Sequence, residues 1–190
     1  GVFIFSRYSD GFVWIGIAYY SLRLIHVLVE WWLGRVEAPT VANHLRYQFF
    51  APVLIAGPIN RMPHFLREWD RRSWNPSEFW SGLERLIFGM FLVAVLSSAL
   101  LGKVETAADR LMRDRSYFLH QWLGSVIDWI QLYISFSGYT SIALGLALMM
   151  GLRLEENFNR PYLATNLIDF WSRWHMTLTS WCRDYVYQPI

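Results

Sequence analysis

The sequence predicts an all-α, polytopic helical membrane protein, and two observations support this fold class. Of the 190 residues, 54% are apolar and 18% aromatic, whereas only 17% are charged. Soluble domains have about 45–50% apolar and about 25% charged residues. The apolar residues are also gathered into runs, and a helix of about 20 apolar residues crosses the core of a bilayer. Composition alone therefore indicates a multi-pass membrane protein and says nothing about its chemistry.

Charge, cysteine and histidine usage exclude several function classes. A formal net charge of +2, with the basic residues scattered along the chain, does not favour a nucleic-acid partner. The single cysteine, Cys182, excludes an internal disulfide. No phosphate-binding loop or dinucleotide fingerprint is present, so we expect no bound cofactor. We also predict no metal site, because metal-ligand spacing is lacking among His26, His44, His64, His120 and His175.

Residues 12–33 form the first predicted span. Arg23, His26 and Glu30 are spaced three and four residues apart, so they share one face of a helix. Charged groups are costly in lipid, and this face is therefore expected to turn toward other helices. Two interpretations remain open: a buried polar cluster that holds the helices together, or an ion path that also uses Asp128.

A polar connection is predicted at residues 34–46, followed by an apolar segment at 47–59. That segment is too short to span a bilayer and is interrupted by Pro52, Gly57 and Pro58. The sequence therefore predicts a re-entrant segment, a structure that is tolerated in a membrane only where protein or a water-filled cavity covers it. This segment either lines a substrate path or only packs against the rest of the protein.

Residues 60–77 are polar, basic and rich in tryptophan, and they predict a loop beside the membrane. Its arginines are Arg61, Arg67, Arg71 and Arg72. The loop is either a solvated face or a docking surface for an acidic partner. Residues 79–101 predict the next span, and residues 102–116 are polar and mixed in charge.

Residues 121–150 are a long apolar run with Asp128, Ser135, Ser137 and Gly138 inside it. We predict one tilted helix with a soft point at Ser137 and Gly138. If this run is a single span, one side of the membrane receives roughly twice as many arginines and lysines as the other. The positive-inside rule then predicts that the C-terminal stretch of the chain lies on the cytoplasmic side.

The C-terminal stretch begins with a turn at residues 157–162, because Pro161 disfavours a helical conformation in the residue before it. Thr165 or Asn166 can then cap a helix. Asp169 falls in the first turn, where a carboxylate suits the positive end of the helix dipole.

Apolar residues recur every three or four positions after the cap: Leu167, Phe170, Trp171, Trp174, Leu178 and Trp181. This spacing predicts one amphipathic helix. His175 lies at the margin of the apolar stripe and shares a face with Trp171 and Thr179. Asp169 and Arg173 form a favourable pair one turn apart. A helix so rich in tryptophan suits the membrane interface better than a membrane span.

Three blocks of this chain resemble one family. They are ENFNRPYLATNLIDFWSRWHMTLTSWCRDYVYQP at residues 156–189, FFAPVLIAGPINR at 49–61 and YISFSGYTSIALGLALMMG at 133–151. Together and in this order they resemble the membrane-bound O-acyltransferase (MBOAT) family, within it the bacterial branch of alginate O-acetylation proteins and teichoic-acid D-alanyl transferases. The chain opens without methionine and stops inside the motif. We therefore expect residues 1–190 to be an internal fragment of a single MBOAT-like membrane domain.

The resemblance implies an enzyme of the bacterial inner (cytoplasmic) membrane. It would move an acyl group, acetyl foremost, from a cytoplasmic thioester donor to a hydroxyl of an extracytoplasmic polysaccharide, as in alginate biosynthesis. The donor would be acyl-CoA or an acyl carrier protein, and membrane lipid, the polysaccharide and other envelope proteins would be further partners. Two alternatives remain open: a transporter subunit, or a non-catalytic scaffold of a polymer-export complex.

His175 is the predicted catalytic residue. The unperturbed pKa of histidine, about 6.5, suits a general base near neutral pH, although a structural role is the alternative. The resemblance places a second, invariant family histidine beyond residue 190, so residues 1–190 alone are expected to be inactive. Arg173, Trp171 and Trp174 are the predicted substrate-binding residues. Arg173 would orient a donor phosphate or contact anionic headgroups.

Three further residues are interpreted through the resemblance. We expect Arg183 to anchor the chain to lipid headgroups. Ser135 and Ser141 stand where the family often has aspartate. Their presence puts in doubt any polar relay that would use those carboxylates.

Overall fold

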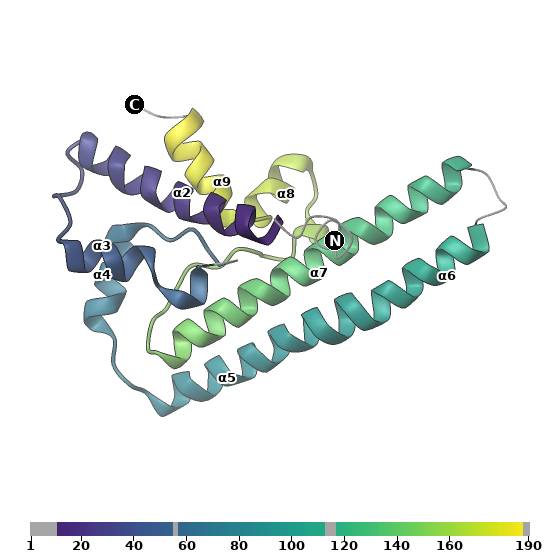
Figure 1. Ribbon diagram of the computed structural model, residues 1–190, viewed down its shortest axis with the longest axis horizontal. Helices are drawn as coiled ribbons and strands as arrows, with labels where there is room; N and C mark the ends of the chain where they lie inside the picture. The colour runs from purple at the N-terminus through teal and green to yellow at the C-terminus, as the bar shows by residue number, and fades with distance from the viewer. Residues whose placement is uncertain (1–10, 55–56, 113–116, 188–190) are drawn as a thin grey trace.

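The computed structural model describes residues 11–54, 57–112 and 117–187, and this part of the chain is all-helical, as predicted (Figure 1). Two long helices lie side by side as an antiparallel hairpin. The shorter helices lie on the side of the hairpin that α7 (Tyr117–Met149) forms; in the view of Figure 1, α9 (Met176–Cys182) crosses α2 (Gly11–Trp32), and α8 (Leu167–Arg173) lies beside it.

The first arm of the hairpin is one continuous helix made of α5 (Pro76–Met90), η2 (Phe91–Leu101) and α6 (Gly102–Met112). Hydrogen bonds of the π type run through η2. The side chain of Asn75 caps the helix by accepting from the backbone N–H of Ser77. Residues 102–112, which are polar and mixed in charge, continue this helix beyond the predicted span, because they contain no helix breaker beyond the single glycine.

The second arm is α7 (Tyr117–Met149), a single helix of 33 residues, which confirms the prediction of one helix in this region. The predicted soft point is not a break, since helical structure continues through Ser137 and Gly138. Within the described ranges, the two helices long and apolar enough to cross a membrane are Pro76–Leu111 and Tyr117–Met149.

Two pairs of glycines explain why the arms pack so closely. A Cβ atom on Gly82 would lie 2.7 Å from the carbonyl oxygen of Gly145, and one on Gly145 would lie 2.7 Å from that of Gly82. Likewise, a Cβ on Gly89 would lie 2.7 Å from the carbonyl oxygen of Gly138. Small residues at such crossings allow helix backbones to approach in a membrane. Gly138 is thus a packing position rather than a flexible one.

The helix α2 (Gly11–Trp32) matches the predicted first span in extent. It is not one of the two helices named above, so its crossing of the membrane stays a prediction. Its polar face turns inward as expected, since Arg23 and His26 are each only 2% exposed. Arg23 donates to the backbone oxygen of Gln48 at 3.3 Å, and its guanidinium carbon lies 4.3 Å from the ring centre of Tyr47. These contacts favour the buried polar cluster over an ion path.

A short helix, α3 (Val41–Gln48), precedes the segment that was predicted to be re-entrant. It ends at Phe49 and is followed by the 3-10 turn η1 (Ala51–Val53) and irregular backbone. Protein covers this backbone, because Val53 and Ile59 are buried. Covered, non-helical backbone is what a re-entrant segment requires. Its depth in a membrane stays a prediction.

The predicted loop at 60–77 is wrong for most of its length, because α4 (Met62–Arg71) occupies it. Met62 and Phe65 are buried, and Leu66 and Trp69 pack against the same core. This spacing of three and four residues marks an amphipathic helix, and the many arginines around it obscured the pattern. Arg67, Arg71 and Arg72 remain on the exposed face.

The predicted single amphipathic helix near the C-terminus is also wrong. The chain forms α8 (Leu167–Arg173), breaks, and then forms α9 (Met176–Cys182), which continues into the π-type turn η4 (Arg183–Tyr187). The predicted turn at residues 157–162 is confirmed, and η3 (Pro161–Leu163) begins within it. Of the two predicted caps, Thr165 and Asn166, the structure has Asn166, whose side chain accepts from the backbone N–H of Asp169 at 2.9 Å.

Candidate functional site

His175 lies at the break between α8 and α9. Its backbone is in the left-handed region, with φ 43° and ψ 54°, whereas Trp174 before it is extended. A residue other than glycine is uncommon in the left-handed region, and such strain is often found at functional sites. The expectation that His175 lies on the margin of an apolar stripe is therefore wrong: the residue turns the chain between two helices.

The loop before α8 holds this break in place. The backbone N–H of Asn159 donates to the oxygen of Arg173 at 2.9 Å, and the N–H of Met176 donates to the oxygen of Asn157 at 2.8 Å. The hydroxyl of Thr177 also donates to Oδ1 of Asn157 at 2.5 Å. Backbone groups that a broken helix leaves unpaired are thus satisfied from outside it. Asn157, which is fully buried, is the centre of this brace.

The imidazole of His175 is buried among aromatic rings and is 8% exposed. Its Nε2 atom lies 3.2 Å from the hydroxyl of Tyr19 in α2. The ring of Phe136 in α7 meets it edge-on at a centroid distance of 4.9 Å, and the ring of Phe158 lies 6.5 Å away. Nδ1 is buried and has no hydrogen-bond partner among the described residues.

Burial lowers the pKa of His175 to about 4, so the ring is neutral at physiological pH. A neutral imidazole has one nitrogen that donates and one that accepts. Nε2 faces Tyr19, and Nδ1 is therefore left as a buried polar atom available to another group. Buried polar groups in proteins are rarely left unpaired, and such an exception calls for an explanation.

Trp174, a predicted substrate-binding residue, lies beside His175 and is 8% exposed. Its ring packs against several aromatic side chains at centroid distances between 5.3 and 6.2 Å: Trp129, Tyr133, Phe158 and Phe170. The indole thereby forms part of a rigid aromatic wall that α7 and α8 share with the loop before α8.

The other two predicted substrate-binding residues are not brought to His175 in the same way. Nε of Arg173 donates to Oδ1 of Asp169 at 2.6 Å, which confirms the predicted pair. The hydrogen bond from Arg173 holds the pKa of Asp169 below its usual value. The ring of Trp171 packs on Phe170, is about half exposed, and makes no ring contact with His175 within the described structure.

Sequence reasoning missed Tyr19, Phe136 and Asn157. Asn157 belongs to the block that resembles the family, and its place before the Asn-Arg-Pro turn was an available signal. Phe136 also belongs to a block that resembles the family, whereas Tyr19 carries no such signal. The contacts of both residues with His175 depend on how distant helices pack. Ser135, which stands where the family often has aspartate, donates its hydroxyl to the oxygen of Leu132 in its own helix at 3.1 Å.

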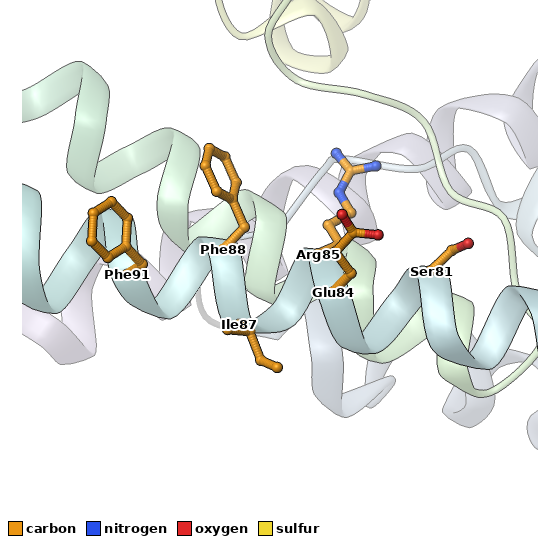
Figure 2. A pocket seen from close by; sticks show the side chains of 6 residues that line it. All are labelled: Ser81, Glu84, Arg85, Ile87, Phe88 and Phe91. Carbon is orange, nitrogen blue, oxygen red and sulfur yellow. The ribbon is translucent and has the colours of Figure 1, made fainter.

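A surface hollow of about 580 Å³ lies along α5 and the first residue of η2 (Figure 2). Its lining residues are Ser81, Glu84, Arg85, Ile87, Phe88 and Phe91. Arg85 donates to both carboxylate oxygens of Glu156 at 2.6 Å. None of the lining residues contributes to the surroundings of His175. In the described part of the chain, no group of three or more His, Cys, Asp or Glu side chains is placed to hold a metal ion.

Comparison with known proteins identifies the family. The chain matches the MBOAT, membrane-bound O-acyltransferase family over residues 12–190. A probable alginate O-acetylase of Pseudomonas aeruginosa is 34% identical over 176 residues, covering 91% of this chain and 33% of that protein. A teichoic acid D-alanyltransferase of Bacillus subtilis is 27% identical over 190 residues, covering 91% of this chain and 44% of that protein.

A peptidoglycan O-acetyltransferase of Helicobacter pylori is 34% identical over 158 residues, covering 80% of this chain and 29% of that protein. The chain thus spans between 29% and 44% of the length of these three relatives. The family match includes His175 and nearly the whole described structure. The chain therefore belongs to the membrane-bound O-acyltransferase (MBOAT) family.

Proposed function

We propose that the protein transfers an acyl group, acetyl foremost, from a cytoplasmic thioester donor to a hydroxyl of an extracytoplasmic polysaccharide. The observation that carries this proposal is the imidazole of His175, which is buried, neutral and held in a strained backbone turn, with Nδ1 unpaired among the described residues. Such a group, enclosed by aromatic rings, is suited to act on a substrate from which water is excluded.

The reaction joins the acceptor to the acyl group in one exchange of bonds. The acceptor hydroxyl attacks the thioester carbonyl, the new C–O bond forms, the C–S bond breaks, and the hydroxyl proton passes to the leaving thiolate. A neutral imidazole can accept a hydrogen bond or a proton from the attacking hydroxyl. With a pKa near 4 it is a weak base, so we assign His175 the role of holding the reacting group through Nδ1.

Trp174 would form the wall against which the acyl group or its carrier arm lies. Arg173 and Trp171, which are partly exposed, would contact the donor farther from the reacting atoms. A guanidinium binds phosphate well, and Arg173 would be available for this only when its contact with Asp169 is shared or released.

The names of the three relatives support an envelope polymer as the acceptor, since they specify alginate, teichoic acid and peptidoglycan. Two of the names specify acetyl transfer and one specifies D-alanyl transfer. We propose the bacterial inner membrane as the location. Acyl-CoA or an acyl carrier protein would be the donor and no bound cofactor would be needed. Alginate-like polysaccharide is the first acceptor to test.

The test uses membranes from a bacterial host that contain the intact protein, with membranes lacking it as control. Radiolabelled acetyl-CoA and an acetylated carrier protein are supplied separately with alginate oligosaccharides, and label in the oligosaccharide is measured. We expect label that depends on the protein with one of the two donors. Label that is absent with both, together with protein-dependent flux of acetate or oligosaccharide in liposomes, would favour a transporter subunit. Absence of both activities would favour a non-catalytic scaffold.

A further inference from the structure

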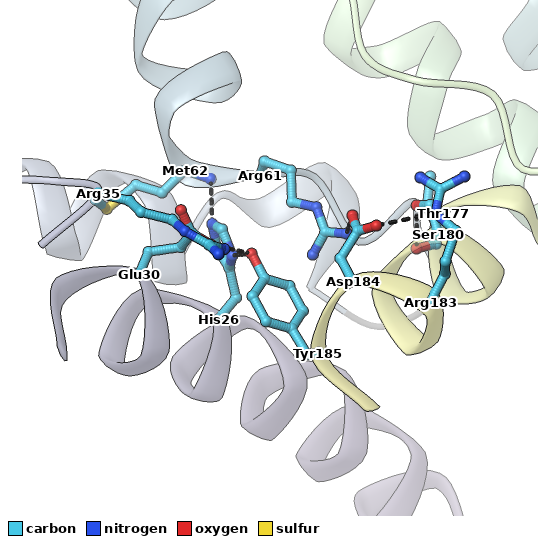
Figure 3. Close-up of polar contacts among 10 residues, drawn as sticks. All are labelled: His26, Glu30, Arg35, Arg61, Met62, Thr177, Ser180, Arg183, Asp184 and Tyr185. Atoms are coloured by element: carbon cyan, nitrogen blue, oxygen red, sulfur yellow. Dashed lines mark hydrogen bonds and ion pairs between the residues drawn. The ribbon is translucent and has the colours of Figure 1, made fainter. Parts of the chain in front are cut away.

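A second polar cluster lies where α2, the start of α4 and η4 meet, apart from the surroundings of His175 (Figure 3). His26 stands at its centre. The backbone N–H of Met62 lies 2.9 Å from Nε2 of His26, and the hydroxyl of Tyr185 lies 2.7 Å from Nδ1. The same hydroxyl lies 2.7 Å from Oε1 of Glu30. The imidazole thus joins two segments that are distant in the sequence.

The donor and acceptor in each of these three hydrogen bonds follow from the backbone N–H of Met62. The backbone N–H of Met62 can only donate, so Nε2 of His26 must accept. In a neutral imidazole the proton is then on Nδ1, which donates to the oxygen of Tyr185. The hydroxyl proton of Tyr185 is left to bond the carboxylate of Glu30. Burial and this hydrogen bond raise the pKa of Tyr185, so the hydroxyl keeps its proton.

Residues 59–62 and the segment made of α9 and η4 are joined directly at two further points. Nη2 of Arg61 lies 2.7 Å from Oδ2 of Asp184, and the guanidinium carbon lies 4.6 Å from the ring centre of Tyr185. The backbone N–H of Ile59 donates to the hydroxyl of Thr177 at 3.0 Å. Residues 59–62 therefore run alongside α9 and η4 and are attached near both ends.

These attachments matter because α9 has no helical continuity with α8. The break at Trp174 and His175 means that α8 does not fix the direction of α9. That direction depends on contacts along α9 and at its far end, where Tyr185 is bound. His26 is 2% exposed and Met62 is 3% exposed, so water competes little for these hydrogen bonds.

We propose that His26 and Tyr185 are positioning residues, whose hydrogen bond orients the segment that begins at His175 against residues 59–62. Neither residue touches the reacting atoms. This inference rests on the proposed acyl transfer, for which it names two further residues that the reaction needs.

The test compares variants of the intact protein in membranes. Tyr185→Phe removes only the hydroxyl and keeps the ring over Arg61. His26→Gln presents an amide oxygen to Met62 and loses the link to Tyr185, whereas His26→Asn keeps an amide donor near the position of Nδ1. Tyr187→Phe is the matched control, because Tyr187 lies in the same turn and is 79% exposed.

We expect Tyr185→Phe and His26→Gln each to lower kcat for acyl transfer by about tenfold while KM for the donor stays near the wild-type value. The double variant should lose no more than either single variant, because one hydrogen bond is removed in each. His26→Asn should retain more activity than His26→Gln. Tyr187→Phe should match the wild type.

A readout independent of activity uses Cys182, a partly buried thiol in α9. Its rate of labelling by a maleimide, followed by mass spectrometry of its peptide, should rise in Tyr185→Phe and stay unchanged in Tyr187→Phe. A wild-type kcat together with unchanged labelling in Tyr185→Phe would overturn the inference. If the wild type transfers no acyl group, the proposed function fails, and the labelling of Cys182 alone decides whether Tyr185 positions α9.

Discussion

Nε2 of His175 lies 3.2 Å from the hydroxyl oxygen of Tyr19, although 156 positions separate the two residues in the chain. Tyr19 belongs to a stripe along α2 that also contains His26 and Glu30, both of which reach Tyr185. One face of α2 thus lies along the segment from His175 to Tyr185 and contacts it at both ends. The C-terminal segment that contains His175 and Tyr185 is therefore held in part by a helix near the other end of the sequence.

Removal of the Tyr19 hydroxyl tests this contact. In Tyr19→Phe, both ring nitrogens of His175 would lack a partner among the described residues, and an unpaired buried polar group costs about 1–3 kcal/mol. We expect the unfolding midpoint in detergent to fall and acyl transfer to decrease. Tyr20→Phe is the control, because Tyr20 is 36% exposed. Equal behaviour of the two variants would contradict the assigned contact.

The low pKa of His175 predicts a specific dependence of stability on pH. The folded pKa is about 4 and that of the unfolded chain is about 6.5, so the unfolded chain binds a proton first as the pH falls. Stability is therefore full above about pH 6.5 and declines toward pH 4, by at most about 3 kcal/mol from this residue. Thermal unfolding at pH 7 and pH 4.5 should show a larger decline for the wild type than for His175→Gln. Parallel declines would rule out a buried neutral imidazole.

The close approach of the two long helices predicts opposite effects for two alanine substitutions in α7. In Gly145→Ala the new methyl group would meet the backbone oxygen of Gly82 at 2.7 Å, and we expect a loss of about 1–3 kcal/mol. In Gly124→Ala nothing lies within 4 Å, and helix propensity predicts a gain of up to about 1 kcal/mol. Unfolding midpoints in detergent measure both. An unchanged unfolding midpoint in Gly145→Ala would mean that the two helices are farther apart than the structure places them.

The brace across the α8–α9 break is tested at Asn157. Asn157→Ala removes the acceptor of the Thr177 hydroxyl and should cost about 1–3 kcal/mol of unfolding free energy. It should also lower acyl transfer, because the turn at His175 loses support. Asn159→Ala is the matched control, since Asn159 is exposed and contributes through its backbone N–H. An equal loss of unfolding free energy in both variants would show that the Asn157 side chain does not stabilise the turn at His175.

The long helices and the cap at Asn166 could be predicted from the sequence because they depend on local features: apolar runs, capping residues and charge spacing. The helix α4 was also predictable in principle from the spacing of Met62, Phe65, Leu66 and Trp69. The break at Trp174 and His175 was not. The helical pattern continues through it without glycine or proline, and the break is held by two backbone hydrogen bonds, one that Asn157 accepts from Met176 and one that Asn159 donates to Arg173.

The candidate site could be predicted only in part, because its geometry depends on contacts between distant segments. His175 was identified from its sequence motif, but its burial and its contacts with Tyr19 and Phe136 depend on packing between α2, α7 and α9. Whether Arg173, Trp171 and Trp174 bind substrate stays a prediction. The side of the membrane on which the C-terminal stretch lies also stays a prediction, although α7 is the single helix on which that prediction depends.

The participation of His175 in acyl transfer is tested most directly by comparing His175→Gln with the wild type in membranes that contain equal amounts of the intact protein. His44→Gln, a histidine substitution in α3, is the control. Label transferred from the donor that serves the wild type to the acceptor polysaccharide is measured per folded protein. Because the hydrogen bond from Nδ1 to the reacting group is lost, we expect a decrease of about tenfold or more in His175→Gln and none in the control. Undiminished transfer by His175→Gln would remove this residue from the mechanism.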